Sequence, residues 1–211
     1  MSWEFGMMAQ QVAAPAGGWT LTETIDDDFS GYTPNDELGA DYSGIWTAVV
    51  GDISVRNGVP VFAEPSSKGS AQTVLRDAMS YDDAFVDLTL LNVAQTGSDN
   101  AQVRCVLRYT DANNFVYFNF NQTGTWKFDR RNGGVTTTIA TGSFTFAAGT
   151  RLLCGIAGQR GLCRIDGADV YDGPFDGGGG LLTTGGHGFI CQVSNVGARR
   201  TGCFASRDGL R

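Results

Sequence analysis

The sequence predicts an all-β protein, a two-sheet antiparallel β-sandwich of the jelly-roll type. Thirty glycines and only five prolines among 211 residues indicate many turns. Short runs rich in Val, Thr, Phe and Tyr stand between these turns, and no long segment has helical periodicity. The runs number about a dozen and follow no repeat of fixed length, which favours a sandwich over a propeller or a solenoid.

The clearest strands lie in the middle of the chain, between Val103 and Arg130. Apolar and polar side chains alternate along three consecutive runs there, and a period of two indicates strands with one buried face. Turn sequences separate the runs, so the segment is typical of a three-stranded meander. The residues predicted to be buried are Val103, Cys105, Leu107 and Tyr109 in the first strand, Val116, Phe118 and Phe120 in the second, and Trp126 and Phe128 in the third.

The two turns of the meander also predict its register. A four-residue loop beginning at Asp111 would place Leu107 opposite Phe118. A three-residue loop ending at a left-handed Gly124 would place Phe118 opposite Phe128. Both loops put the large apolar residues on one face, which a slip of one residue would undo. The opposite, polar face then carries Arg104, Arg108, Tyr117, Asn119, Lys127 and Asp129.

The other strands are predicted in chain order, with two Asn-Gly pairs as hairpin turns. In the run over 84–94, we expect Val86, Leu88 and Leu90 to face inward and to extend the buried face as a fourth strand, with Leu88 near Leu107. The predicted strands are 19–25, 45–49, 53–56, 59–63 and 84–94 before the meander, and 135–140, 143–146, 151–157, 162–166, 169–171, 188–193 and 202–206 after it.

The chain is predicted to form one domain over residues 19–211, preceded by an arm over residues 1–18. A net charge of −7 argues against nucleic acid as a partner. No run is long and apolar enough for a membrane span. Residues 1–11 lack the positive charge and the long apolar run of a signal peptide, so we expect a chain that stays in the cytoplasm.

The cysteines fit a reducing compartment. Their number is odd, and they form no CxxC pair. Each lies in a strand-like run, where a reduced thiol packs as a small hydrophobic group. A disulfide between Cys154 and Cys163 is the alternative interpretation. The five are Cys105, Cys154, Cys163, Cys191 and Cys203.

Two features flank the first predicted strand, residues 19–25. The arm is apolar, and we expect it to dock on a neighbouring subunit of a homo-oligomer or a larger assembly, with a disordered leader as the alternative. The aspartates of residues 26–28 are expected to form a solvated turn, although neighbouring carboxylates also suit calcium. The residues concerned are Trp3, Phe5, Met7 and Met8 in the arm, and Asp26, Asp27 and Asp28 in the turn.

Several motifs, taken in order, resemble the concanavalin A-like lectin/glucanase jelly rolls, and the laminin-G-like modules most closely. The resemblance covers residues 19–211. It implies a jelly-roll sandwich that binds glycans or proteins, assists a hydrolase, or decorates a phage particle. The matching residues are Asp27 to Ser30, Trp46, Asn57 and Gly58, Arg108 to Phe118, Trp126 to Arg130, Ile165 to Gly167, and Gly185 to Phe189.

Enzyme chemistry is not predicted. Glycoside hydrolysis needs two carboxylates flanking one bond, and the Glu-x-Asp-x-x-Glu motif of related glucanases is absent. The single histidine, His187, has no second histidine as a metal partner, and we expect it to be a surface or capping residue at a strand-entry turn. No metal or other cofactor is therefore expected, apart from the calcium alternative.

Binding is the better prediction for the polar face of the meander. Aromatic rings meet sugar faces, while amide, carboxylate and guanidinium groups hold hydroxyls. The candidate ligand-binding residues are Arg108, Tyr117, Asn119 and Asp129, and the alternative is an ordinary solvated sheet face.

The sequence thus predicts a non-enzymatic structural or recognition module. The expected setting is a phage virion assembled in the bacterial cytoplasm, where the protein would be a capsid decoration or a tail-associated protein. Its partners would be other virion subunits and a surface glycan. The alternative is a stand-alone carbohydrate-binding module or an accessory domain of a glycoside hydrolase.

Overall fold

The computed structural model describes residues 46–50, 53–56, 59–62, 71–76, 83–90, 102–147, 149–175 and 185–192. For residues 46–76 and 189–192 it describes the backbone alone. The predicted strands at 19–25 and 202–206, the arm and the three aspartates lie outside this part of the chain. No helix of the described residues is long and apolar enough to cross a membrane.

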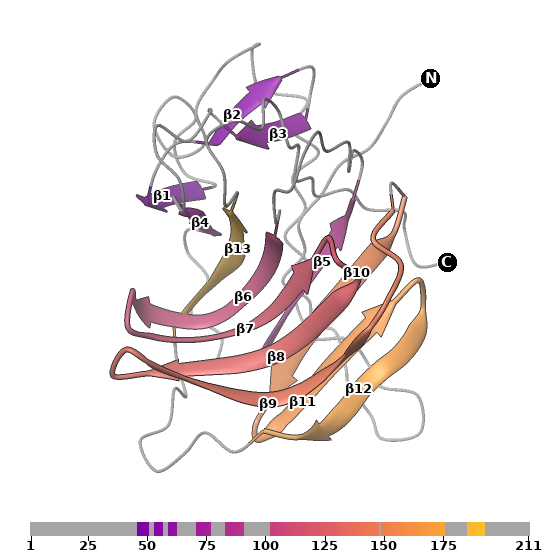
Figure 1. Ribbon diagram of the computed structural model, residues 1–211. Coiled ribbons are helices and arrows are strands. Elements are labelled where there is room, and N and C mark those ends of the chain that lie inside the picture. Colours follow the sequence, from indigo (N-terminus) through magenta and orange to yellow (C-terminus); the bar gives the residue numbers. More distant parts are fainter. Residues whose placement is uncertain are drawn as a thin grey trace.

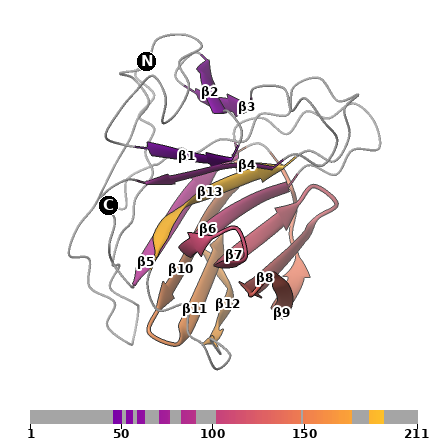
Figure 2. The same cartoon turned by 90° about the vertical axis from the view of Figure 1, so that its left-hand side faces the viewer.

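Every regular element of the described residues is a β-strand, in two antiparallel sheets and a separate hairpin, which confirms the predicted fold class. Figures 1 and 2 show the two sheets as the layers of a sandwich. In spatial order, the seven-stranded sheet contains β1 (Trp46–Val50), β4 (Ala71–Arg76), β13 (Gly186–Gln192), β6 (Gln102–Asp111), β7 (Asn114–Asn121), β8 (Thr125–Asn132) and β9 (Val135–Ser143). The four-stranded sheet contains β12 (Ala168–Pro174), β11 (Arg160–Ile165), β10 (Arg151–Ala157) and β5 (Ala84–Thr89), and the hairpin pairs β2 (Ile53–Arg56) with β3 (Val59–Phe62).

The main core fills the space between the two sheets. It takes alternate side chains from β6, β7 and β8 on one side and from β5, β10 and β11 on the other. Phe118 stacks on Phe128 with ring centroids 4.1 Å apart, and Phe175 follows β12 into the same cluster. The alternation that predicted the meander therefore corresponds to one face of β6, β7 and β8 that is buried between the sheets.

The register of the meander is confirmed at its second turn and wrong along most of its first hairpin. Phe118 lies opposite Phe128, and Gly124 has a φ of 83°. In contrast, Leu107 lies opposite Val116 rather than Phe118. The pairing shifts by two residues between Leu107 and the turn, and a shift of two leaves each side chain of β7 on its predicted face.

A β-bulge at Arg108 causes this shift. Arg108 has a φ of 50°, which is uncommon for a residue with a side chain. Its N–H donates to Nδ1 of His187 at 3.3 Å. Gly185 lies so close that a Cβ there would come within 2.5 Å of the Arg108 carbonyl carbon. His187 is 1% exposed, so it caps the bulge from the interior and is not a surface residue.

The bulge turns the side chain of Arg108 into the space between the sheets. Its Nη2 donates to the carbonyl oxygen of Gly158 at 3.0 Å and to Oδ1 of Asp83 at 3.2 Å. The same carboxylate oxygen accepts the Gly158 N–H at 2.7 Å. Arg108 belongs to β6 of the seven-stranded sheet. Asp83 precedes β5 and Gly158 lies in the β10–β11 turn, both next to strands of the four-stranded sheet, so one guanidinium connects the two sheets. The prediction that Arg108 belongs to the polar face is therefore wrong.

The fourth predicted strand belongs to the opposite sheet. β5 pairs with β10, and its Val86 and Leu88 enter the core across from β6. The prediction of inward side chains is confirmed, but this strand does not continue the sheet of the meander. β4 occupies residues that were expected to lie in a loop or outside any strand, and the predicted run at 143–146 is irregular after Ser143.

The described cysteines confirm the prediction of buried, reduced thiols. Cys105, Cys154 and Cys163 are free and fully buried in the main core. The sulfurs of Cys154 and Cys163 lie 3.8 Å apart across β10 and β11, so they are in contact without a disulfide. Burial raises the pKa of the Cys105 and Cys154 thiols, which keeps them protonated.

Replacing Arg108 with methionine tests the interior ion pair. We expect Arg108→Met to lower the free energy of unfolding by about 2 kcal/mol, because Asp83 and the Gly158 carbonyl lose a charged donor while Asp83 keeps partial access to water. Denaturant unfolding of Arg108→Met, Asp83→Asn and the double variant gives the coupling energy, expected at about 1 kcal/mol. Strictly additive effects would contradict the pairing.

Candidate functional site

The candidate site lies on the face of the seven-stranded sheet that points away from the main core. We call this the outer face. Cross-strand pairing on β6 to β9 arranges its side chains in three rows. The first row contains Arg104, Asn119, Lys127 and Thr141, the second Val106, Tyr117, Asp129 and Thr138, and the third Phe115, Arg131 and Thr136.

Tyr117 forms the centre of the outer face. The guanidinium carbon of Arg104 lies 5.2 Å from the centroid of its ring, within the range of a cation–π interaction. Nε of Arg104 donates to Oδ1 of Asn119 at 3.4 Å, and Nη2 donates to Oε1 of Gln102 at 3.1 Å. Arg104 is thus held over the tyrosine ring by neighbours on β6 and β7.

Asp129 lies beside Tyr117 and is 4% exposed. Its Oδ1 accepts a hydrogen bond from Oγ1 of Thr138 at 2.7 Å. Burial raises the pKa of the Tyr117 hydroxyl, and the negative charge of Asp129 raises it further, while Arg104 acts in the opposite direction. Tyr117, Asp129 and Arg104 therefore form one electrostatically connected group.

Aromatic rings continue along the outer face from Tyr117. The Tyr117 and Phe115 ring centroids lie 5.1 Å apart, and those of Phe115 and Tyr109 lie 5.5 Å apart. Together with Val106 these rings form a small apolar cluster separate from the main core. Tyr109, which was predicted to be in the main core, joins this second cluster because it follows the bulge.

The outer face is open on its β8–β9 side. Lys127, Thr136, Thr138 and Thr141 are exposed, whereas Tyr117 is 6% exposed. The site thus combines a buried aromatic and carboxylate floor with an exposed rim of hydroxyls and one ammonium group. The exposed rim can hold hydroxylated ligands by hydrogen bonds.

Three of the four predicted ligand-binding residues come together on this face, namely Tyr117, Asn119 and Asp129. The fourth, Arg108, lies between the sheets. Arg104 takes the place expected for Arg108. Arg131 and the threonines of β9 lie on the same face. Alternation places Arg104 on the polar face, as predicted, but the sequence gives no signal for the bulge that separates it from Arg108.

No group of three His, Cys, Asp or Glu side chains among the described residues is arranged to hold a metal ion. The predicted calcium alternative concerns Asp26 to Asp28, which lie outside those residues. Among the outer-face residues named above, Asp129 is the one carboxylate.

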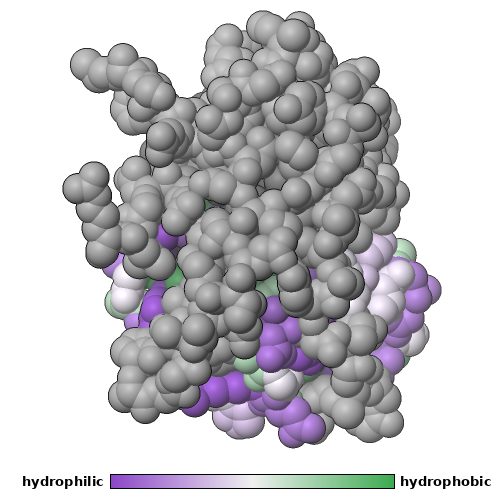
Figure 3. Space-filling model, turned by 180° about the vertical axis from the view of Figure 1, so that it is seen from behind, coloured by the Kyte–Doolittle hydropathy of each residue, from purple (hydrophilic) through white to green (hydrophobic). Residues whose placement is uncertain are grey.

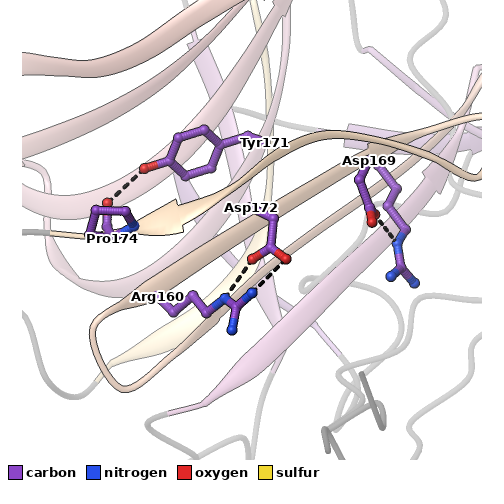
Figure 4. A network of polar contacts seen from close by, with 6 residues as sticks. Arg160, Asp169, Tyr171, Asp172 and Pro174 are labelled. Carbon is purple, nitrogen blue, oxygen red and sulfur yellow. Dashed lines mark hydrogen bonds and ion pairs between the residues drawn. The ribbon is translucent and has the colours of Figure 1, made fainter. Parts of the chain in front are cut away.

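The exterior of the four-stranded sheet has a different character, because each of its arginines faces a carboxylate. Arg160 binds Asp172 through Nε and Nη2, as Figure 4 shows. Nε of Arg164 donates to Asp169. Nε of Arg151 donates to Asp87 at 3.0 Å. Seen from behind, the described surface is mostly hydrophilic with small apolar areas (Figure 3). Each described arginine of this sheet thus has a carboxylate partner.

Comparison with known proteins identifies the fold. No family model matches the chain, and neither does any curated protein. The carbohydrate-binding module CBM66 from Bacillus subtilis has a TM-score of 0.53 and 17% identity, covering 82% of this chain and 98% of that module. The carbohydrate recognition domain of Emp46p, in its potassium-bound form, has a TM-score of 0.57 and 11% identity over 88% and 96%.

An enzyme has the same architecture. SCLam, a non-specific endo-β-1,3(4)-glucanase of family GH16, has a TM-score of 0.52 and 12% identity, covering 92% of this chain and 86% of that one. The fold is therefore the concanavalin A-like lectin/glucanase sandwich, as the sequence motifs indicated. At sequence identities of 17% and below, the likeness shows the fold alone, and an activity depends on the side chains of the site.

Titration of the tyrosines tests the electrostatic connection between Tyr117, Asp129 and Arg104. We expect Asp129→Asn to lower the pKa of Tyr117 and Arg104→Met to raise it, because the carboxylate opposes the phenolate and the guanidinium favours it. Nuclear magnetic resonance of carbon-labelled tyrosine rings, followed over alkaline pH, resolves the individual residues.

Tyr109 is the internal control, because its pKa is raised by burial and by Asp111 rather than by Asp129. Its pKa should stay constant in both variants. A Tyr117 pKa that is unchanged in Asp129→Asn would contradict the arrangement.

Proposed function

We propose that this chain is a non-enzymatic glycan-binding module and that the outer face is its binding surface. The observation that carries the proposal is the group of Arg104, Tyr117 and Asp129 beside the exposed rim of β9. Polar groups held in place beside exposed hydroxyls suit a sugar, which presents hydroxyls at its edges.

The roles follow from the contacts of each group. The ring of Tyr117 is 6% exposed and lies under the guanidinium of Arg104, so it forms the floor that positions the polar groups of the site. Asn119 and Asp129 offer acceptors for hydroxyls, and the exposed threonines of β9 offer both donors and acceptors. The shared architecture with CBM66 and with the recognition domain of Emp46p supports the proposal by analogy of fold.

We propose a binding role rather than catalysis because of the carboxylates. Cleavage of a glycosidic bond uses two of them on either side of the bond. Asp129 is the one carboxylate of the outer-face rows, and it is already engaged by Thr138 at 2.7 Å. In this proposal it holds a hydroxyl and does not transfer a proton.

A panel of glycans, screened with matched aspartate variants, tests the proposal. We expect the wild type to bind one class of glycan and Asp129→Asn to lose roughly tenfold in affinity, the value of one charged hydrogen bond. Asn119→Ala should lose several-fold for the same reason. Asp172→Asn, which removes a carboxylate from the other sheet, should bind like the wild type.

Thermal unfolding of each variant is the control for a retained fold. Absence of binding to every glycan, or an equal loss in Asp172→Asn, would contradict the proposed surface. Release of sugar fragments from a polysaccharide panel would contradict the absence of catalysis.

A virion setting is the second proposal, and it rests on the sequence of the arm alone. The side chains of Trp3, Phe5, Met7 and Met8 are apolar and lie outside the described residues. An apolar segment of this kind suits docking on other virion subunits during assembly in a bacterial cytoplasm. In that setting the glycan would be a surface glycan met by the particle.

Deletion of residues 1–18 tests the virion proposal. We expect the full chain to sediment as an oligomer or with particles, and the shortened chain to sediment as a monomer with unchanged glycan binding. A full chain that is already monomeric in infected-cell lysate would contradict this setting and would leave the binding proposal intact.

A further inference from the structure

β9 is an edge strand with one unpaired side. It ends the seven-stranded sheet, and β8 is its one partner among the described strands. The backbone N–H and C=O groups on its other side can therefore pair with a further strand. The first residues of β9, 135–138, are all exposed. Among the described residues, Val135 is the exposed large hydrophobic side chain, at 69%. This stretch of β9 is thus open for docking.

The composition of β9 does not block such pairing. Edge strands of proteins commonly carry charges, prolines or bulges that prevent a further strand from adding. The sequence of β9 contains no charged residue and no proline, and its one bulge, at Ile139, lies beyond the exposed stretch. In contrast, the edge strand β12 contains Asp169, Asp172 and Pro174, and the edge strand β5 is buried. Among the edge strands whose side chains are described, β9 is therefore the one suited to strand addition.

The core is incompletely covered on the same side of the sandwich. β9 and β12 are the edge strands of the two sheets there (Figure 1), and the ring centroids of Phe128 and Tyr171 lie 5.3 Å apart. Ile139 and Ala140 of β9 pack against the core but are only partly buried, as are Val170 and Tyr171 of β12. A strand added to β9 with apolar side chains on its inner side would remove such apolar surface from water, which is favourable.

The arm has the alternation that such a strand needs. Residues 2–7 read Ser-Trp-Glu-Phe-Gly-Met, so a large apolar side chain occupies every second position. In an extended strand Trp3, Phe5 and Met7 share one face, and the polar side chains of Ser2 and Glu4 lie on the other. Paired with β9, the apolar face would cover the exposed part of the core, while the polar face would continue the outer face.

We propose that residues 2–7 of one copy of the chain add as a strand to residues 135–138 of β9 in a second copy. This inference rests on the proposed docking of the arm and names the surface that receives it. The contact uses the backbone of the edge and the inner side of the strand. The outer-face hydroxyls of β9 therefore stay accessible to a glycan.

Two other occupants of the edge are less favourable. Alternation with the outer-face threonines directs Val135 and Thr137 to the inner side. A second copy of β9 would thus add one apolar side chain there, whereas the arm adds three. The arm of the same copy would have to pass from β1, where the described chain begins, to the opposite edge of the sheet. This distance is six strand spacings, about 29 Å, whereas a neighbouring copy can approach β9 directly.

Photo-cross-linking in the purified full chain locates the docking site. The photoreactive residue p-benzoylphenylalanine replaces Phe5, and copies labelled with heavy nitrogen are mixed with unlabelled copies under dilute conditions and then concentrated. Trypsin releases β9 within the peptide 132–151, because no Lys or Arg lies inside it. We expect mass spectrometry to find the arm joined to residues 135–138, including pairs in which one peptide is labelled and the other is not.

Charged substitutions test the same contact by sedimentation. We expect Val135→Lys to weaken self-association about tenfold or more, because a charge on the inner side of an edge blocks strand addition. Phe5→Asp should weaken it to a similar extent, because it turns an apolar contact of the arm into a buried charge. Ala168→Lys adds the same charge to the exposed start of β12 and should associate like the wild type. Since Val135 is 69% exposed, Val135→Lys should keep the melting temperature of the wild type.

Each other outcome overturns the inference. Cross-links found only between peptides of one isotope would show that the arm docks on its own copy. Cross-links to other peptides, with unchanged association of Val135→Lys, would place the docking surface elsewhere and leave the docking of the arm intact. Loss of association in Val135→Lys but not in Phe5→Asp would show that β9 pairs with β9. A full chain that stays monomeric without cross-links would remove both this inference and the docking of the arm.

Discussion

The side chain of Arg108 lies between the two sheets, and much of the structure depends on this placement. Its guanidinium contacts Asp83 before β5 and the carbonyl of Gly158 in the β10–β11 turn, so it holds both sheets at one end of the sandwich. The backbone reaches this position through a left-handed conformation, which His187 stabilises by accepting the Arg108 N–H. A cation that strict alternation would place outside is thereby buried, with its charge balanced locally.

The bulge also determines what remains on the outer face. Because the shift in pairing is two residues, Tyr117, Asn119 and Asp129 keep their orientation, and Arg104 alone of the two β6 arginines stays above the tyrosine ring. The phenylalanines of β7 and β8 fill the core behind them. Packing therefore fixes the floor of the site, while the exposed hydroxyls of β9 leave its edge accessible. The proposed binding surface depends on the same alternation that forms the core.

The sequence contained most of the fold but only part of the site. Alternation at Val116, Phe118 and Phe120 predicted their burial, and Gly124 predicted a turn that the structure confirms. The bulge could not be predicted, because Arg108 carries no local signal for a left-handed conformation; the causes are Gly185 and His187, nearly eighty residues away. Similarly, alternation along β5 predicts which of its side chains face inward but not which sheet the strand joins. Its partner β10 lies far away in the sequence, and no local pattern in β5 identifies it.

The inward position of Arg108 can be tested by chemical modification of arginines with phenylglyoxal, followed by mass spectrometry of the peptides. Arg160, whose side chain is 52% exposed, should react quickly in the folded protein. Arg108, at 3%, should react only as fast as the whole protein unfolds. If Arg108 reacts as fast as Arg160 under native conditions, the guanidinium is not between the sheets, and the account of the bulge and of the outer face is contradicted.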